Sequence, residues 1–193
     1  MEKPAHTDHH IHPLIAARWS PRALSADPAL TDEEVARLFE AARWAPSSGN
    51  SQPWGYVYGL AGTPGFDTLL GCLTPGNASW CARAGALVIA CARTKDDKGE
   101  PIRHCDHDLG LSVAMLLLEA TAMGLAIHPM AGFEPEKAVE VLSIPAPWRP
   151  TTAIAIGRPA PLDVLSDRLR DRELAPRVRK PQAEIAFRDR WAG

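Results

Sequence analysis

A segment from Asp108 to Met123 places the strongest constraint on the fold, because its apolar side chains fall on nearly every side of a helix. These side chains are Leu109, Leu111, Val113, Met115, Leu116, Leu117 and Leu118. Such a helix has to be covered on several sides, by its own domain or by a second subunit, and we favour a subunit interface. The apolar run is shorter than the ~20 residues that cross a bilayer. We therefore expect a buried helix and no membrane partner.

Shorter elements are expected before and after this helix. Thr31 and Glu34 form a capping-box pattern ahead of an amphipathic helix that runs to about Trp44. Apolar runs bounded by turn residues predict strands over 54–60, 86–91 and 151–156, short helices near 66–72 and 134–142, and an extended segment with a loop over 124–133.

Composition bounds the architecture and the partners. The 193 residues are 46% apolar, so we expect a single domain over 1–193, with a compact two-lobed subunit as the alternative. The net charge is 21 − 23 = −2, which gives no basic excess to favour nucleic acid. The four cysteines form no CxxC pair, and the N-terminus lacks the apolar core of a secretory signal. Reduced thiols and a cytoplasmic location are expected.

Two groups of side chains have the chemistry to bind zinc or nickel. They are His6, His9, His10 and His12 near the N-terminus, and His104, Cys105 and His107 before the buried helix. We interpret residues 1–12 as a mobile His-rich tail, and the second group as the approach to the helix, with Asp106 or Asp108 as its cap. No metal site is expected. A cysteine nucleophile is also disfavoured, because only Cys105 has histidines beside it.

A polar loop from Pro46 to Trp54 follows the capped helix. Its two prolines fix the backbone φ angle, and between them stand hydroxyl and amide side chains, those of Ser47, Ser48, Asn50, Ser51 and Gln52. This composition favours a site for a polar ligand mounted on a rigid helix. The alternative is a simple connection into the next strand.

Arg18, Ser20 and Arg22 form a second polar cluster, upstream of the helix. Arginine offers a planar fork of donors that suits phosphate, and a nearby serine adds a neutral donor. The cluster is typical of a phosphate site. Solvated surface charge is the alternative for two arginines near a chain end.

Taken in order, these motifs resemble the nitroreductase family of flavin-dependent oxidoreductases, and the likeness extends from about Ala17 to Phe187. It is carried by Arg-x-Ser-x-Arg at 18–22, Pro-Ser-Ser-x-Asn-x-Gln-Pro-Trp at 46–54 and Pro-Arg-x-Arg-Lys-Pro at 176–181. The resemblance implies an α+β fold with a mainly antiparallel central sheet flanked by helices. It also implies a homodimer with FMN in two clefts between subunits, and a C-terminal arm over 160–193 that wraps around the partner.

The resemblance assigns a role at the FMN site to residues from several parts of the chain. Those matching phosphate-binding positions are Arg18, Ser20, Arg177 and Arg179, while Trp19 contacts the flavin through its backbone. Those at the pyrimidine edge of the ring are Arg22 and Asn77. Those contributed by the other subunit are Ser47 and Ser48, in a loop that Asn50 helps to hold.

The 129–132 loop, with Met130, Ala131 and Gly132, matches the segment that lies over the flavin ring with backbone amides near N5. Ala131 departs from the family pattern, because some members carry glutamate there. The departure leaves FMN binding intact, since a backbone donor does not depend on its own side chain. Whether it alters nicotinamide binding stays open.

The implied reaction is hydride transfer from NAD(P)H through flavin N5 to a small oxidised acceptor, such as a nitroaromatic, quinone or enal, by a ping-pong mechanism. No catalytic side chain is expected, because the flavin carries the chemistry. The alternatives are a non-catalytic flavin-binding or redox-sensing module of the same fold, or a specialised flavin dehydrogenase. NADH and NADPH are not distinguished, because the chain has no GxGxxG fingerprint.

Overall fold

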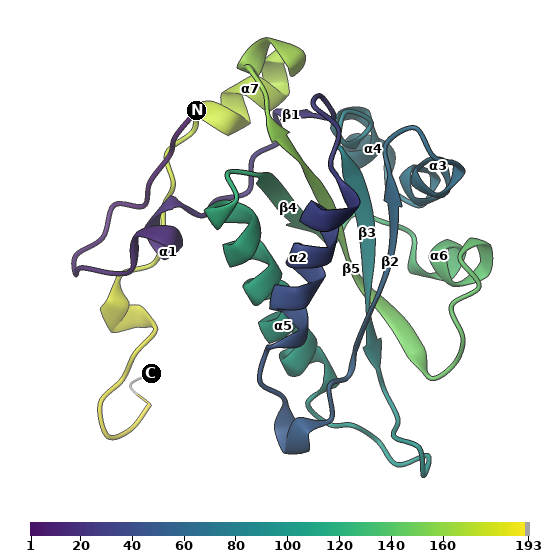
Figure 1. Ribbon diagram of the computed structural model, residues 1–193. Helices are drawn as coiled ribbons and strands as arrows, with labels where there is room; N and C mark the ends of the chain where they lie inside the picture. The colour runs from purple at the N-terminus through teal and green to yellow at the C-terminus, as the bar shows by residue number, and fades with distance from the viewer. Residues whose placement is uncertain (192–193) are drawn as a thin grey trace.

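The sheet is antiparallel throughout the part of the chain that the structure describes. The structure is a computed structural model that describes residues 1–191. The strand order is β1-β5-β3-β2, and β4 also pairs with β5 (Figure 1). The strands are β1 (Leu24–Ser25), β2 (Trp54–Leu60), β3 (Ala86–Arg93), β4 (Ala126–Met130) and β5 (Trp148–Pro159). The predicted α+β class with an antiparallel sheet is therefore confirmed.

Helices cover both faces of the sheet, so the central strand β3 is buried on both sides. One face carries α2 (Asp32–Arg43) and α5 (Cys105–Ala122). The other carries α3 (Pro64–Gly71), α4 (Pro75–Cys81) and α6 (Pro135–Val141). Successive side chains of a strand point to opposite faces. In β3, Val88 accordingly packs in the α2–α5 core, and Leu87 and Ile89 pack in the other.

The capped helix agrees with the sequence prediction. Thr31 accepts a hydrogen bond from the backbone of Glu34, whose carboxylate accepts one from the backbone of Thr31. The helix ends at Arg43, with Trp44 as its C-cap. This capping box begins the element that carries the polar loop at its far end.

The prediction for the start of the long apolar helix was wrong. Helix α5 begins at Cys105 with His104 at the N-cap, so Asp106 and Asp108 lie in its first turn and neither caps it. Its own domain buries part of the apolar surface, including Leu109, Val113 and Leu116. Met115 is 37% exposed. Within residues 1–191, no helix has the length and apolar character needed to span a membrane.

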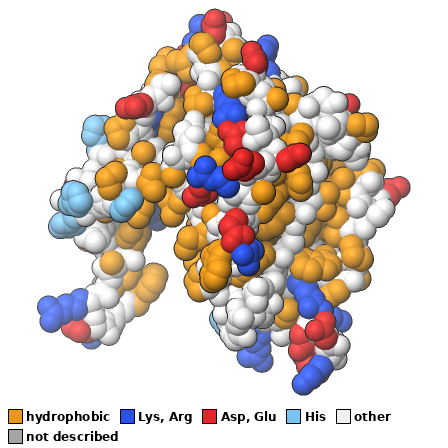
Figure 2. Space-filling model, in the orientation of Figure 1, with side chains coloured by type: hydrophobic (Ala, Val, Ile, Leu, Met, Phe, Trp, Pro, Cys, Tyr) orange, Lys and Arg blue, Asp and Glu red, His pale blue; other side chains and the backbone are white. Residues whose placement is uncertain are grey.

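Residues after β5 contain a helix that the sequence did not indicate, α7 (Asp167–Leu174). Beyond α7, the chain runs beside the N-terminal segment, which contains α1 (Pro13–Ala17) (Figure 1). Together they form a limb, and an open notch separates its lower part from the body of the molecule (Figure 2). The limb exposes apolar side chains, among them Ile15, Val178, Ile185 and Trp191.

Candidate functional site

A basic cavity of about 230 Å³ lies where the two ends of the chain meet. Pairing of Leu24 with Pro159 places the start of β1 beside the end of β5, so the segment before β1 lies close to the segment that follows β5. The cavity is lined by six cationic side chains, by one carboxylate and by Trp19, Ser20, Ala175 and Pro176. The cationic side chains are Lys3, Arg18, Arg22, Arg172, Arg177 and Arg179, and the carboxylate is Glu173.

The Arg18 guanidinium lies near other positive charges and has little negative charge nearby to offset them. Its Nη1 donates to Ser20 Oγ at 3.2 Å. Burial, together with the charges of Arg177 and Arg179, lowers the pKa of the Arg18 guanidinium. Like charges are held together at this cavity, and an anion bound there would relieve their repulsion. The structure thus brings together the four residues predicted to bind phosphate.

The Arg177 guanidinium donates its hydrogen bonds to backbone carbonyls of the N-terminal segment. Its Nη1 donates to the carbonyls of Lys3 and Ala16 at 2.7 and 2.9 Å, and its Nη2 donates to the carbonyl of Arg18 at 2.9 Å. Arg179 Nη1 donates to the carbonyl of Val178. Arg177 therefore holds the N-terminal residues around the cavity while adding its charge to it.

Glu173 is a site residue that sequence reasoning missed. Its side chain is only 1% exposed, and its Oε1 accepts hydrogen bonds from the backbone amides of Arg22 (2.7 Å) and Ala23 (3.2 Å). Its Oε2 has no hydrogen-bond partner and lies 3.6 Å from Arg22 Nη1. Burial and the charge of Arg172 lower the pKa of Arg22, and Glu173 opposes them. No signal in the sequence singled out this glutamate from its charged neighbours.

His128 also escaped the sequence analysis. It lies on β4, where its Nδ1 donates to the Pro21 carbonyl at 3.0 Å and its ring packs on Trp80 at 4.8 Å. Burial, with smaller contributions from the nearby guanidiniums of Arg22 and Arg18, lowers the pKa of His128 to about 4, so the ring is neutral at pH 7. The neutral ring ties the segment between α1 and β1 to the central sheet.

The 130–132 loop and Asn77 meet on the same side of the sheet. Asn77 Nδ2 and Thr74 Oγ1 donate to the Gly132 carbonyl at 3.0 and 3.1 Å. A β-carbon at Gly132 would lie 2.5 Å from Asn77 Nδ2, so a larger residue there would displace the Asn77 side chain. Met130 is buried, with its sulfur 3.8 Å from the Cys81 sulfur, and Ala131 is exposed. Met130 ends β4, and His128 of the same strand bonds to the Pro21 carbonyl beside Arg22, so the loop begins near the basic cavity.

The polar loop stands apart from the basic cavity in this chain. Helix α2 runs away from the α7 end of the sheet, and the loop follows at the opposite end (Figure 1). Ser48 N donates to the buried carboxylate of Asp108 at 3.0 Å, and Gln52 N donates to Ser47 Oγ at 3.0 Å. Asn50 has a positive φ of 55° in this tight turn. Its contribution to a site in a second subunit stays a prediction.

Comparison with known proteins identifies the family. Residues 15–58 and 69–158 match the Nitroreductase family. The chain belongs to the nitroreductase family. A Mycolicibacterium smegmatis protein described as an uncharacterized 15.4 kDa protein is 34% identical to it over 126 residues, which is 65% of this chain and 84% of that protein. A Streptomyces coelicolor protein provisionally named an NADH dehydrogenase/NAD(P)H nitroreductase is 26% identical over 155 residues, 70% and 76% of the two chains.

Solved structures agree with this nitroreductase assignment. A crystal structure described as an oxidoreductase containing FMN superposes with a TM-score of 0.93 at 31% identity, covering 97% of this chain and 96% of that one. A Desulfovibrio desulfuricans protein described provisionally as a nitroreductase in complex with FMN gives a TM-score of 0.71 at 26% identity, covering 95% and 100%. The chain is therefore an oxidoreductase of this family, as predicted.

Three of the four cysteines in this nitroreductase are poor nucleophiles. Burial raises the pKa of Cys72, Cys81 and Cys91, the last to about 11, so these thiols are protonated at neutral pH. Within residues 1–191, no three His, Cys, Asp or Glu side chains are grouped to hold a metal ion.

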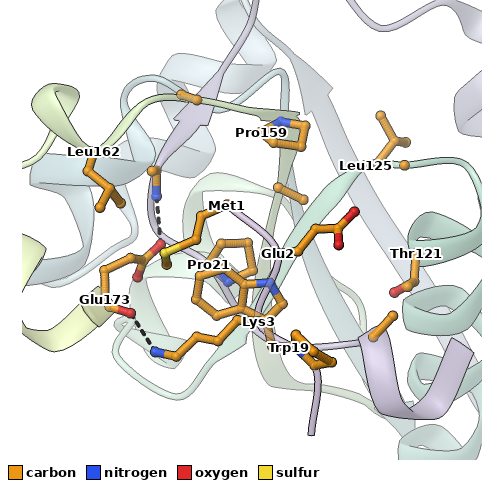
Figure 3. A pocket seen from close by; sticks show the side chains of 16 residues that line it. Met1, Glu2, Lys3, Trp19, Pro21, Thr121, Leu125, Pro159, Leu162 and Glu173 are labelled. Carbon is orange, nitrogen blue, oxygen red and sulfur yellow. Dashed lines mark hydrogen bonds between the residues drawn. The ribbon is translucent and has the colours of Figure 1, made fainter. Parts of the chain in front are cut away.

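A second cavity of about 400 Å³ lies against the first and shares Lys3, Trp19 and Glu173 with it. Met1 and Glu2 line one side of it, and Leu125 and Pro159 line the sheet side (Figure 3). Lys3 Nζ donates to the Glu173 carbonyl, which fixes the N-terminal segment against α7. Glu173 therefore stands between the two cavities and contacts the segments that bound both.

Proposed function

We propose that this nitroreductase is an FMN-dependent oxidoreductase that transfers hydride from NAD(P)H to a small oxidised acceptor, such as a nitroaromatic, quinone or enal, by a ping-pong mechanism. The observation that carries the proposal is the convergence of basic side chains from both ends of the chain on one cavity. A related crystal structure at 31% identity is described as containing FMN, and a relative is provisionally named an NAD(P)H nitroreductase.

The donor set of the basic cavity fits the phosphate of FMN. Six cations face a single carboxylate there, and Ser20 adds a hydroxyl. Guanidiniums bind phosphate with paired hydrogen bonds, and a partly buried cluster of like charge is stabilised by an anion. Arg18 and Ser20 would bind the phosphate, with the charges of Arg177 and Arg179 behind them, and Trp19 would contact the flavin through its backbone.

Other residues of the chain would hold the flavin ring. Arg22 and Asn77 would stand at its pyrimidine edge, where a fixed positive charge stabilises the negative charge of the reduced form. The backbone of Met130, Ala131 and Gly132 would lie over the ring, in a loop whose shape depends on the bond from Asn77 to the Gly132 carbonyl. Bound FMN supplies a two-electron centre that accepts and donates hydride at N5. No side chain of the protein is required as a nucleophile or general acid.

We propose that two copies of the chain are needed to complete this site. Ser47, Ser48 and Asn50 would come from the second copy, because in one chain they lie at the other end of α2 from the basic cavity (Figure 1). Val178, Ile185 and Trp191, the exposed apolar side chains of the C-terminal part of the limb, and the notch beside the limb support an arm over 160–193 that wraps around the partner. In this arrangement residues 1–193 form one domain. Within the 1–12 tail, Lys3 is held at the cavity by Arg177 and by the Glu173 carbonyl, so the tail is anchored there rather than mobile along its whole length.

The test is an absorbance spectrum of the purified protein followed by anaerobic titration with NADH and, separately, NADPH. Bound FMN that is bleached by a nicotinamide and recovers on adding a quinone would support the proposal. A flavin that ignores both nicotinamides would favour the redox-sensing module or a specialised dehydrogenase. Protein that takes up no FMN would sink the proposal.

Substituting Arg18 with alanine should weaken FMN binding about 10-fold or more, because a charge-assisted hydrogen bond to phosphate contributes about 1.5–3 kcal/mol. Arg83→Ala is the matched control, since Arg83 is exposed and does not line the cavity. Fluorescence titration of the flavin-free proteins measures both affinities. Equal losses in the two variants would contradict a specific phosphate contact.

A further inference from the structure

The buried carboxylate of Glu173 is the feature of the basic cavity that phosphate binding leaves unexplained. A single negative side chain beside an anion site weakens that site, yet Glu173 is 1% exposed and lies among the six cations of the cavity lining. It comes from α7, far along the chain from the segment it contacts. Because Glu173 contacts both the backbone and the side chain of Arg22, its role at the cavity is to be sought in its effect on Arg22.

The two oxygens of Glu173 have different environments. Oε1 accepts from the amides of Arg22 and Ala23, and so fixes the backbone from which the Arg22 side chain projects. Oε2 accepts no hydrogen bond and faces Arg22 Nη1 at 3.6 Å, an ion-pair distance. One oxygen orients the residue, and the other offsets its charge.

We propose that Glu173 is a positioning residue that sets how much positive charge Arg22 presents at the basic cavity, and thereby limits how strongly the site stabilises an anion, including reduced FMN. The part concerning FMN rests on the proposed function. Without Glu173, Arg22 would stabilise the anionic reduced FMN further, which raises the midpoint potential and makes the flavin a weaker reductant for the acceptor. Glu173 moderates that preference while keeping Arg22 in place.

Glu173→Gln separates the two roles. The amide oxygen of glutamine can still accept from Arg22 N and Ala23 N, whereas the negative charge facing Arg22 is lost. Since Oε2 has no hydrogen-bond partner, no hydrogen bond is lost on that side. If Glu173 were needed only for folding, Glu173→Gln would bind anions more weakly. If Glu173 moderates the charge of Arg22, the variant binds anions more tightly.

The first measurement uses flavin-free protein and inorganic pyrophosphate, titrated by calorimetry. Glu173→Gln should bind pyrophosphate about three- to tenfold more tightly than the wild type, and Arg22→Ala should bind it more weakly. In the Arg22→Ala background the Glu173→Gln effect should largely disappear, because the charge it unmasks is gone. Glu184→Gln, which removes one exposed carboxylate from the same C-terminal segment, should leave the affinity unchanged.

The second measurement is the FMN midpoint potential by spectroelectrochemistry. Glu173→Gln should bind reduced over oxidised FMN about tenfold better than the wild type does, which corresponds to a rise of ~30 mV for two electrons. Arg22→Ala should shift the potential the other way. Unchanged or weaker pyrophosphate binding in Glu173→Gln, or an unchanged or lower potential, would overturn the proposal.

Failure of this proposal is distinguishable from failure of the proposed function. Wild-type protein that binds no FMN would refute the function, and the pyrophosphate titration would still test Glu173. Circular dichroism melting checks that each variant is folded. If Glu173→Gln is unfolded, Glu173→Asp takes its place, because it keeps the charge but withdraws it from Arg22 by one methylene. It should shift both quantities in the same direction by a smaller factor, and a shift in the opposite direction would overturn the proposal.

Discussion

The neutral imidazole of His128, which is bonded to the Pro21 carbonyl in the Arg18–Arg22 segment, makes the free energy of unfolding depend on pH. The pKa of His128 is about 4 in the folded protein, against about 6.5 unfolded, because burial disfavours its charged form. Between these values the unfolded chain binds more protons, so the contribution of this group is complete above pH 6.5 and is lost as the pH falls toward 4. At pH 5 the expected loss is about 2 kcal/mol relative to pH 7.5.

His128→Asn tests this dependence, because asparagine can still donate to the Pro21 carbonyl but does not titrate. Urea unfolding at pH 7.5 and pH 5, at one fixed FMN concentration, gives the free energy of unfolding of both proteins. The wild type should lose about 2 kcal/mol more than the variant between the two pH values. Equal losses would show that His128 is not the responsible group.

At the scale of elements, sequence pattern predicted those parts whose side chains repeat with a clear period. The helix after Thr31 and the strand over 54–60 were found because capping chemistry and apolar runs are local signals. Helix α7 was missed because most of its residues are charged and exposed, and its one fully buried side chain is a glutamate. The start of α5 was misplaced because Asp108 faces Ser48, a partner that lies far away in the sequence.

That contact joins α5 to the polar loop and can be tested by itself. Asp108→Ala leaves the Ser48 amide without its acceptor, and a buried charged hydrogen bond contributes about 1.5–3 kcal/mol. Asp106→Ala is the matched control, because Asp106 stands in the same first turn but pairs with Arg149 in an exposed position. Loss of this exposed ion pair should lower the free energy of unfolding by under about 1 kcal/mol. Urea unfolding measures both, and comparable costs would contradict a special role for Asp108.

At the scale of the whole molecule, the sequence was a better guide to the part of the candidate site that lies within one chain than to the part that a second chain would supply. Arg18 and Arg22 meet the residues of the C-terminal segment because β1 pairs with the end of β5, so the resemblance and the geometry agree within one chain. Ser47 and Ser48 lie at the opposite end of α2, where they do not reach the basic cavity of their own chain. Their role depends on how a second copy is arranged, which the local pattern of a single chain does not contain.

Mixed dimers test that arrangement directly. One variant carries Arg18→Ala and Arg22→Ala, and the other carries Ser47→Glu and Ser48→Glu, which place negative charge in the loop. If the cavity of one copy is completed by the loop of the other, each variant alone lacks functional sites. A mixed dimer then has one site with both defects and one with none, since a two-fold interface exchanges the same surfaces in both directions.

Unfolding the two variants together and refolding them should therefore restore roughly a quarter of the wild-type FMN sites per chain. Flavin fluorescence after gel filtration counts the bound FMN, and circular dichroism checks that both variants fold. Refolding each variant separately before mixing is the control for recovery unrelated to subunit exchange. Full FMN binding by the loop variant alone, or no recovery in folded mixed dimers, would show that the loop does not complete the partner's site.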